Sequence, residues 1–202
     1  MSTLFVISGP SGAGKSVLIR RILEDVPAIR FSVSSTTRRP RPGEIDGVDY
    51  HFISREQFQT DLDSGGFLEH AQFSANLYGT NRGELAAAES QGQDLLLDIE
   101  VQGARQLQEK GIEAVYIFVT PPSFAELERR LRSRNTEDEV AIQRRLRQAV
   151  EDVSHVHRYQ FVIVNDNLEE AYSRLRSIFV AERSRLLRME FSLKPILASF
   201  QK

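Results

Sequence analysis

The stretch Leu4–Ser16 reads LFVISGPSGAGKS, and the rest of the chain is best interpreted outward from it. Its first four residues are apolar strand formers, a glycine-rich turn follows, and an amphipathic segment begins at the end. Gly9, Gly14, Lys15 and Ser16 fit the pattern G-x-x-x-x-G-K-[ST] in the context of strand, turn and helix that this motif requires. The sequence therefore predicts a loop that binds nucleotide phosphates.

The chemistry of phosphate binding explains this spacing. Glycines let successive backbone N–H groups turn inward around a phosphate chain, and the helix that follows points its positive end at the same phosphates. Lys15 can reach the outer phosphates, and the Ser16 hydroxyl can bind Mg²⁺. A glycine-rich turn could also spell the motif by chance, but the required context makes that rare. The predicted ATP-binding residues of the loop are Gly9, Pro10, Ser11, Gly12, Ala13, Gly14, Lys15 and Ser16.

Composition restricts the function classes. The chain has 202 residues, 41% hydrophobic and 27% charged, which suits one globular domain with one substantial core. With a net charge of −2 the protein as a whole is not attracted electrostatically to nucleic acid or to a membrane surface, so we expect neither as a partner. Cysteine is absent, which excludes disulfides and Cys-ligated zinc. No apolar run has the length of a membrane span, and Met1–Thr3 leaves no room for a signal peptide, so we expect a cytoplasmic protein.

The basic residues are skewed toward arginine. Only Lys15, Lys110, Lys194 and Lys202 are lysines. Arginine suits planar, bidentate recognition of phosphate, although genomic base composition could produce the same bias. The loop from Ser35 to Gly43 gathers three arginines without acids inside it, which favours an anion-binding role for that loop.

Strands and helices are predicted to alternate along most of the chain, which indicates an α/β fold around a parallel sheet. Beyond the first strand, strands are expected at 31–34, 48–52, 67–73, 95–100, 115–119 and 161–164, and helices at 15–26, 54–64, 81–92, 101–110, from 123, from 136 and at 168–188. Tyr78–Thr80 is expected in a loop, Asn81 and Thr136 are expected to cap helices, and the tail after Arg188 is not assigned. The region 34–82 interrupts the alternation with short strands and is interpreted as an inserted substrate region.

Two acids end the apolar run Leu95–Glu100. Asp98 and Glu100 lie two residues apart, on the same face of a buried strand and at its carboxyl end. Ligands of parallel α/β sheets bind at that edge. Asp98 is therefore predicted to position Mg²⁺, directly or through water, together with Ser16.

Several separated motifs together resemble guanylate kinase. They are SGPSGAGKS, FSVSSTTRRPRPGE, the DY of Asp49-Tyr50, the E-x-A-x-F-S of Glu69–Ser74, YGT, LLLDIEVQGA and VNDNLEEA, and the resemblance extends to about Arg183. It implies a single domain over 1–202, a P-loop three-layer fold with a central parallel sheet. The core would cover about 1–33, 83–125 and 148–202. A GMP-binding region with short mixed strands would cover about 34–82, and a helical lid about 126–147.

The resemblance also implies site roles. GMP would be bound by Ser34, Arg38, Arg41, Tyr50, Glu69, Tyr78, Thr80, Asp98 and Glu100. Arginine forks and phenol hydroxyls suit a dianionic phosphate. An ionised carboxylate at Glu69 can accept from the N1–H and N2–H₂ donors of guanine, whereas adenine would present an acceptor to it. A solvated strand carboxylate is the alternative for Glu69, as a solvated loop is for the two arginines.

Catalysis would depend on cations around the transferring phosphoryl group. The predicted catalytic residues are Lys15, Arg38, Arg130, Arg134 and Arg145, and Asn165 and Asp166 would lie near the adenine of ATP. Some of the helical arginines are instead expected to pair with neighbouring glutamates. Asn135 replaces a glycine of the family pattern, a mild change because asparagine tolerates positive φ. Glu100 stands where the family often has Asp.

The sequence thus predicts transfer of the γ-phosphoryl group of MgATP to GMP, with Mg²⁺ as the cofactor. A homo-oligomer of the chain is a possible assembly. Two alternatives stay open. One is a catalytically inactive protein-binding module of guanylate-kinase type, which the intact Lys15 and Ser16 disfavour. The other is a related P-loop kinase for another small phosphorylated substrate, such as a ribose phosphate, which Glu69, Ser34 and Thr80 disfavour. The four histidines are interpreted as structural or surface residues, with no metal site of protein ligands.

Overall fold

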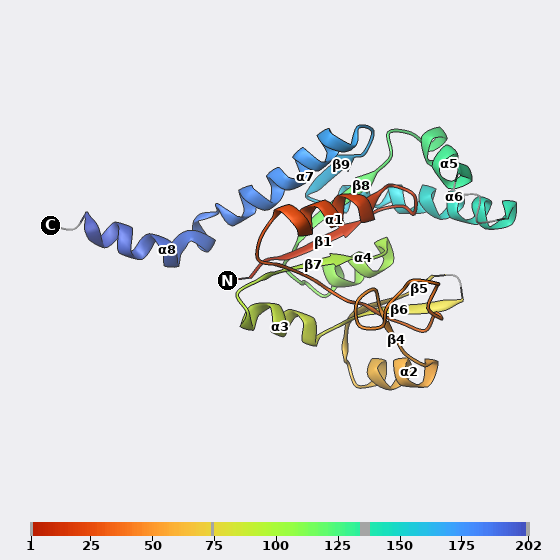
Figure 1. Ribbon diagram of the computed structural model, residues 1–202, viewed down its shortest axis with the longest axis horizontal. Helices are drawn as coiled ribbons and strands as arrows, with labels where there is room; N and C mark the ends of the chain where they lie inside the picture. Colours follow the sequence, from red (N-terminus) through yellow and green to blue (C-terminus); the bar gives the residue numbers. More distant parts are fainter. Residues whose placement is uncertain (1, 74, 134–137, 201–202) are drawn as a thin grey trace.

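A computed structural model describes residues 2–73, 75–133 and 138–200 (Figure 1). Its centre is a sheet of five parallel strands in the order β2-β7-β1-β8-β9. β1, β7 and β8 occupy the middle and are buried along nearly their whole length, as their continuous apolar sequences predict. The strands are β1 (Leu4–Ser8), β2 (Ile29–Phe31), β7 (Asp94–Asp98), β8 (Val115–Thr120) and β9 (Phe161–Val164).

Helices cover both faces of this sheet and make a three-layer fold. On one face α1 (Lys15–Asp25) and α7 (Leu168–Arg183) share a core with β1, in which the rings of Phe5 and Phe179 stack at 4.0 Å. On the other face α3 (Gly83–Ser90) and α4 (Val101–Glu109) pack on the alternate side chains of β1 and β7. The predicted α/β class with a central parallel sheet is confirmed.

A second, mixed sheet lies beside the central one, in the order β4-β3-β6-β5. β3 pairs parallel with β4 and antiparallel with β6, and β5 and β6 are antiparallel. Its strands are β3 (Ser35–Thr36), β4 (His51–Phe52), β5 (Phe67–Phe73) and β6 (Asn76–Asn81). The helix α2 (Arg55–Asp63) begins at the predicted cap Ser54, and its Phe58 stacks on Phe67 at 4.5 Å.

Several local predictions are wrong. The strand expected at 48–52 is only β4, His51–Phe52. Tyr78–Thr80 lies in β6 rather than in a loop, because pairing with β3 and β5 holds a segment whose own sequence does not alternate. Asn81 does not cap α3, since its side-chain amide donates to Ser35 Oγ at 2.9 Å. The strand expected at 31–34 is β2, which ends at Phe31. The helix expected to reach Arg188 ends at Arg183, and Ser184 follows it.

Two helices form a small separate core above the carboxyl end of the sheet. They are α5 (Phe124–Ser133) and α6 (Glu139–Ser154), and they pack through Leu127, Leu131, Ile142, Leu146 and Ala149. Ser123 Oγ accepts from the Glu126 N–H at 3.1 Å, as predicted. Asp138 caps α6 by accepting from the Ala141 N–H at 2.7 Å, so the cap is not Thr136, which lies outside the described residues.

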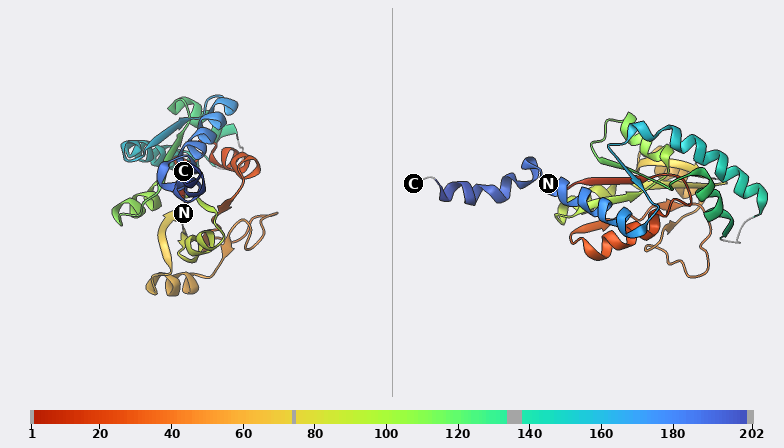
Figure 2. Two further views of the ribbon diagram at one scale, coloured as in Figure 1. Left: turned by 90° about the vertical axis from the view of Figure 1, so that its left-hand side faces the viewer. Right: turned by 90° about the horizontal axis from the view of Figure 1, so that it is seen from above.

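The tail that the sequence left unassigned forms another helix, α8 (Leu186–Ser199). Figure 2 shows that α8 extends away from the body of the protein instead of packing back on it. Several of its large apolar side chains are exposed, among them Leu186, Leu187 and Ile196. Within the described residues, none of the helices has both the length and the apolar character needed to cross a membrane.

Candidate functional site

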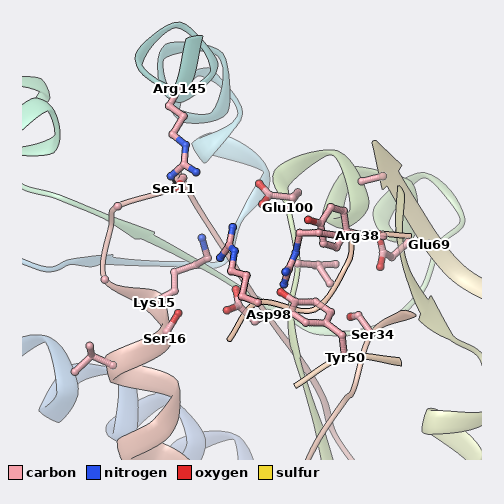
Figure 3. A pocket seen from close by; sticks show the side chains of 17 residues that line it. Ser11, Lys15, Ser16, Ser34, Arg38, Tyr50, Glu69, Asp98, Glu100 and Arg145 are labelled. Carbon is pink, nitrogen blue, oxygen red and sulfur yellow. Dashed lines mark hydrogen bonds between the residues drawn. The ribbon is translucent and has the colours of Figure 1, made fainter. Parts of the chain in front are cut away.

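A cavity of about 330 Å³ lies at the carboxyl end of β1 and β7, between the P-loop and the mixed sheet. In Figure 3 Lys15 and Ser16 lie at one side, Glu69 at the other, and Asp98 and Tyr50 between them. Of the predicted site residues, those that line it are Ser11, Gly12, Gly14, Lys15, Ser16, Ser34, Arg38, Arg41, Tyr50, Glu69, Tyr78, Asp98, Glu100 and Arg145. Most of the predicted phosphate and base contacts therefore share one space.

The remaining predicted residues lie around this cavity without lining it. They are Gly9, Pro10, Ala13, Thr80, Arg130, Asn165 and Asp166. Pro10 lines a second, apolar hollow below α5 instead. Thr80 is fully buried behind Glu69, and Asp166 is exposed. Arg134 and Asn135 lie outside the described residues, so their predicted roles are untested.

The P-loop has the backbone that its glycines predict. Gly9, Gly12 and Gly14 all have positive φ, and a Cβ at Gly9 would stand 2.0 Å from the Val119 carbonyl oxygen, so no larger residue fits there. Lys15 Nζ donates to the Gly9 carbonyl at 2.7 Å. The ammonium group is therefore folded back over its own loop, and Lys15 lines the cavity.

Asn165 supports the loop from below. Its buried side-chain amide donates to the Ala13 carbonyl at 2.8 Å, and a Cβ at Gly14 would meet that amide at 2.3 Å. The backbone carbonyl of Asn165 accepts from Arg130, 2.9 Å away. In this arrangement Asn165 connects the P-loop to α5.

The arginines of α5 and α6 differ in what they contact. Arg145 donates to Ser11 Oγ at 3.1 Å, so it spans from α6 to the P-loop. Arg130 is held by Glu126 at 2.7 Å as well as by Asn165, and its neighbours Arg129 and Arg132 pair with glutamates of the same helices. These pairs hold the pKa of Glu126 near 2, so Glu126 stays ionised at neutral pH. The expectation that some helical arginines pair with glutamates is confirmed.

Two carboxylates line the cavity beyond β7: Asp98 ends the strand, whereas Glu100 is the N-cap of α4 and does not lie on the strand as predicted. Burial raises the pKa of Asp98, an effect that Lys15 opposes and Glu100 adds to. Burial raises the pKa of Tyr50 to about 12, and the charge of Asp98 adds to the rise. No group of three or more His, Cys, Asp or Glu side chains able to hold a metal occurs among the described residues.

Arg38 is not an isolated cation. Glu44 accepts from both guanidinium nitrogens of Arg38, at 2.9 and 2.8 Å, and from the Arg41 N–H at 2.7 Å. The hydrogen bonds from Arg38 lower the pKa of Glu44 to about 2. Arg38 also lies 5.4 Å from the Tyr50 ring centre. Glu44 directly follows the arginine-bearing loop 35–43, and this adjacency in sequence is the signal for the ion pair.

Glu69 is the most deeply buried acid of the site, with 3% of its surface exposed. Thr80 Oγ1 donates to its Oε1 at 2.6 Å, because β5 and β6 place the two residues opposite each other. Burial raises the pKa of Glu69 to about 7, with the Thr80 hydrogen bond opposing the rise. A buried carboxylate with one donor keeps acceptor capacity for a ligand.

Replacing Glu69 with glutamine should make the protein more stable at pH 8 and leave stability nearly unchanged at pH 5. The carboxyl pKa rises from 4.5 to about 7 on folding, so its proton stabilises the folded state at low pH and that contribution is lost as pH rises through 7. Glutamine keeps the shape without the charge. The gain at pH 8 should be on the order of 3 kcal/mol, since one pKa unit corresponds to about 1.4 kcal/mol.

Urea unfolding of both proteins at the two pH values measures this difference. A difference in the free energy of unfolding that does not change with pH would contradict the buried, destabilised carboxylate.

Comparison with known proteins gives one consistent result. The family model described as guanylate kinase matches residues 1–182. A guanylate kinase of Desulfitobacterium hafniense is 45% identical over 188 residues, covering 93% of this chain and 94% of that protein. One from Syntrophotalea carbinolica is 50% identical over 186 residues, covering 92% of this chain and 89% of that protein. The crystal structure of guanylate kinase from Anaplasma phagocytophilum superimposes with a TM-score of 0.73 at 35% identity, covering 93% of this chain and 89% of that one.

Proposed function

The chain belongs to the guanylate kinase family, and on that premise we propose how its residues transfer the γ-phosphoryl group of ATP to GMP. It is a nucleoside monophosphate kinase, an ATP:GMP phosphotransferase. A single observation carries the assignment of the site: one cavity joins a P-loop with Lys15 to a buried carboxylate, Glu69, at its other end.

In the proposed reaction a phosphate oxygen of GMP attacks the γ-phosphorus of ATP. A new P–O bond forms, the bond to the β–γ bridging oxygen breaks, and ADP leaves with that electron pair. The protein supplies alignment and positive charge and no nucleophile of its own. Lys15 exchanges its contact with the Gly9 carbonyl for the phosphates, while the P-loop N–H groups cradle them.

Magnesium is the proposed cofactor, and the donor set fits it. Ser16 and Asp98 line the same cavity and would supply two protein ligands. Mg²⁺ in phosphoryl-transfer sites is usually held by one or two protein groups, with water and substrate phosphates as the other ligands. Bound Mg²⁺ would neutralise charge that develops on the phosphates. Asp98 and Ser16 would hold it, Asp98 directly or through water.

GMP is proposed to lie across the cavity from the P-loop. Its phosphate would be held by Arg38, Arg41, Tyr50 and Tyr78, and the pair with Glu44 orients Arg38 for that role. Its guanine would meet Glu69, with Ser34 and Thr80 beside it. The predicted contact of Glu100 with GMP stays a prediction, and so do the domain boundaries, with the lid at about 126–147.

A panel of nucleoside monophosphates tests this function. ADP formation from ATP should require GMP and be far slower with AMP, CMP or UMP. No ADP with any of them would favour the binding module, and turnover with a ribose phosphate alone would favour the other P-loop kinase.

Replacing Arg145 with alanine should lower kcat by about 10²–10³-fold and change the KM for GMP little. Its contact with Ser11 places the guanidinium over the P-loop, where it would stabilise charge on the transferring phosphoryl group. Single-turnover transfer and steady-state KM separate the two effects. Arg147→Ala is the matched control, since Arg147 is exposed on the same helix and should be silent. An unchanged single-turnover rate with lost GMP binding would show that Arg145 acts elsewhere.

The remaining partner and location statements stay predictions. They are self-association of the chain, the absence of nucleic-acid and membrane partners, and a cytoplasmic location. The substrates ATP and GMP follow from the family.

A further inference from the structure

Gly103 is the third residue of α4 and has helical backbone that other residues readily adopt. Glycine destabilises a helix interior relative to alanine, because it loses more backbone freedom on folding. Gly103 is not among the glycines with positive φ, so a left-handed backbone does not explain it. The reason has to be space.

That space is occupied by the Glu69 carboxylate. A Cβ added at Gly103 would stand 2.0 Å from Glu69 Oε2 and 2.8 Å from its Cδ, far inside van der Waals contact. Gly103 is itself buried, so the two residues face each other in the interior. An alanine there requires the carboxylate to move.

Glu69 has little freedom to move with its strand. On one side Lys110 Nζ donates to the Leu68 carbonyl at 2.7 Å. On the other, the Gln106 side chain accepts from the His70 N–H at 3.2 Å and donates to the His70 carbonyl. Helix α4 and its C-cap Lys110 therefore hold the backbone of β5 on both sides of Glu69 while Gly103 faces its side chain.

Thr80 limits the remaining directions. Its hydroxyl donates to Glu69 Oε1, so the carboxylate is enclosed by Thr80 at one oxygen and Gly103 at the other. The cavity is the direction left open, and it is where the base of the monophosphate would bind.

We propose that Gly103 is a positioning residue: by leaving room for Glu69 Oε2 it sets where the carboxylate meets the base, and so sets selectivity for the 2-amino group. This inference rests on the proposed role of Glu69. Guanine offers both N1–H and N2–H₂ to the two carboxylate oxygens, whereas the hypoxanthine of inosine monophosphate (IMP) offers only N1–H. Displacement of Oε2 removes the advantage of GMP over IMP.

The test compares kcat/KM for GMP and IMP in native protein and in Gly103→Ala. We expect native protein to prefer GMP, and the GMP/IMP ratio to fall by about 10-fold or more in the variant, on the scale of a hydrogen bond to a charged group. The loss should appear in the KM for GMP, with kcat nearly kept. Gly83→Ala is the matched control, because a Cβ at that helical glycine meets open space.

A second variant distinguishes positioning from general packing. Glu69→Asp retracts the carboxylate by one methylene, so adding Gly103→Ala to it should cost much less than in native protein. If Gly103→Ala alone does not fold, recovery of the fold by Glu69→Asp supports the proposal, and failure of both to fold overturns it. A native GMP/IMP ratio in folded Gly103→Ala, or strictly additive effects, also overturns it. All of these outcomes are compatible with GMP kinase activity in the native protein. Absence of that activity in the native protein would instead contradict the proposed function.

Discussion

Lys15→Ala should lower kcat by about 10³-fold or more, the scale for removing a cation aimed at a transferring phosphoryl group. Lys15 lines the cavity, and its ammonium donates to the Gly9 carbonyl at 2.7 Å, within reach of phosphates that the loop would cradle. Rapid-quench measurement of GDP formation under saturating ATP and GMP reports the chemical step directly.

The fold should survive this substitution. The positive φ angles of Gly9, Gly12 and Gly14 and the Asn165 hydrogen bond to Ala13 shape the P-loop without the Lys15 side chain. Thermal unfolding should therefore be close to native. Near-normal GDP production by Lys15→Ala would remove the proposed mechanism.

The sequence predicted the parts of the site that depend on local pattern. The P-loop is a contiguous motif, so its glycines, lysine and serine predict one local backbone geometry. The place of Asp98 in the site could be predicted because an apolar strand ends at that acid. The capping serines 54 and 123 were predictable for the same reason, because their partners lie three residues away.

What the sequence could not predict depends on contacts between distant segments. Tyr78–Thr80 becomes a strand only through pairing with β3 and β5. The match of Gly103 to Glu69 joins residues 34 positions apart, and its one local signal was a glycine inside an amphipathic helix. The pairing of Glu44 with Arg38 is a local contact, six residues apart, and could have been predicted from the acid that follows the arginine-bearing loop.

Glu69→Ala should lower kcat/KM for GMP by about 10²-fold or more, the scale of a lost hydrogen-bond pair to a charged group. Glu69 is buried, accepts from Thr80 Oγ1 at one carboxylate oxygen, and lines the cavity, so it keeps acceptor capacity for the base. Adenine would place a hydrogen-bond acceptor against the carboxylate, which also only accepts. This mismatch is the basis of discrimination between GMP and AMP. The effect on AMP should therefore be much smaller than the effect on GMP.

Arg41→Ala is the matched control for this prediction. Arg41 lines the same cavity, and its proposed partner is the phosphate, which is identical in GMP and AMP. Its loss should weaken both substrates alike and leave their ratio unchanged. Assays belong at pH 8, where a carboxyl with a pKa of about 7 is ionised.

The most direct test of the account is the GMP/AMP ratio of kcat/KM in native protein, Glu69→Ala and Arg41→Ala. We predict a ratio on the order of 10⁴ for native protein, the scale of sites that leave a buried polar group unpaired with the wrong substrate. The ratio should collapse in Glu69→Ala and persist in Arg41→Ala. A native ratio in Glu69→Ala would mean that this carboxylate does not read the base, and the assignment of the cavity would fail.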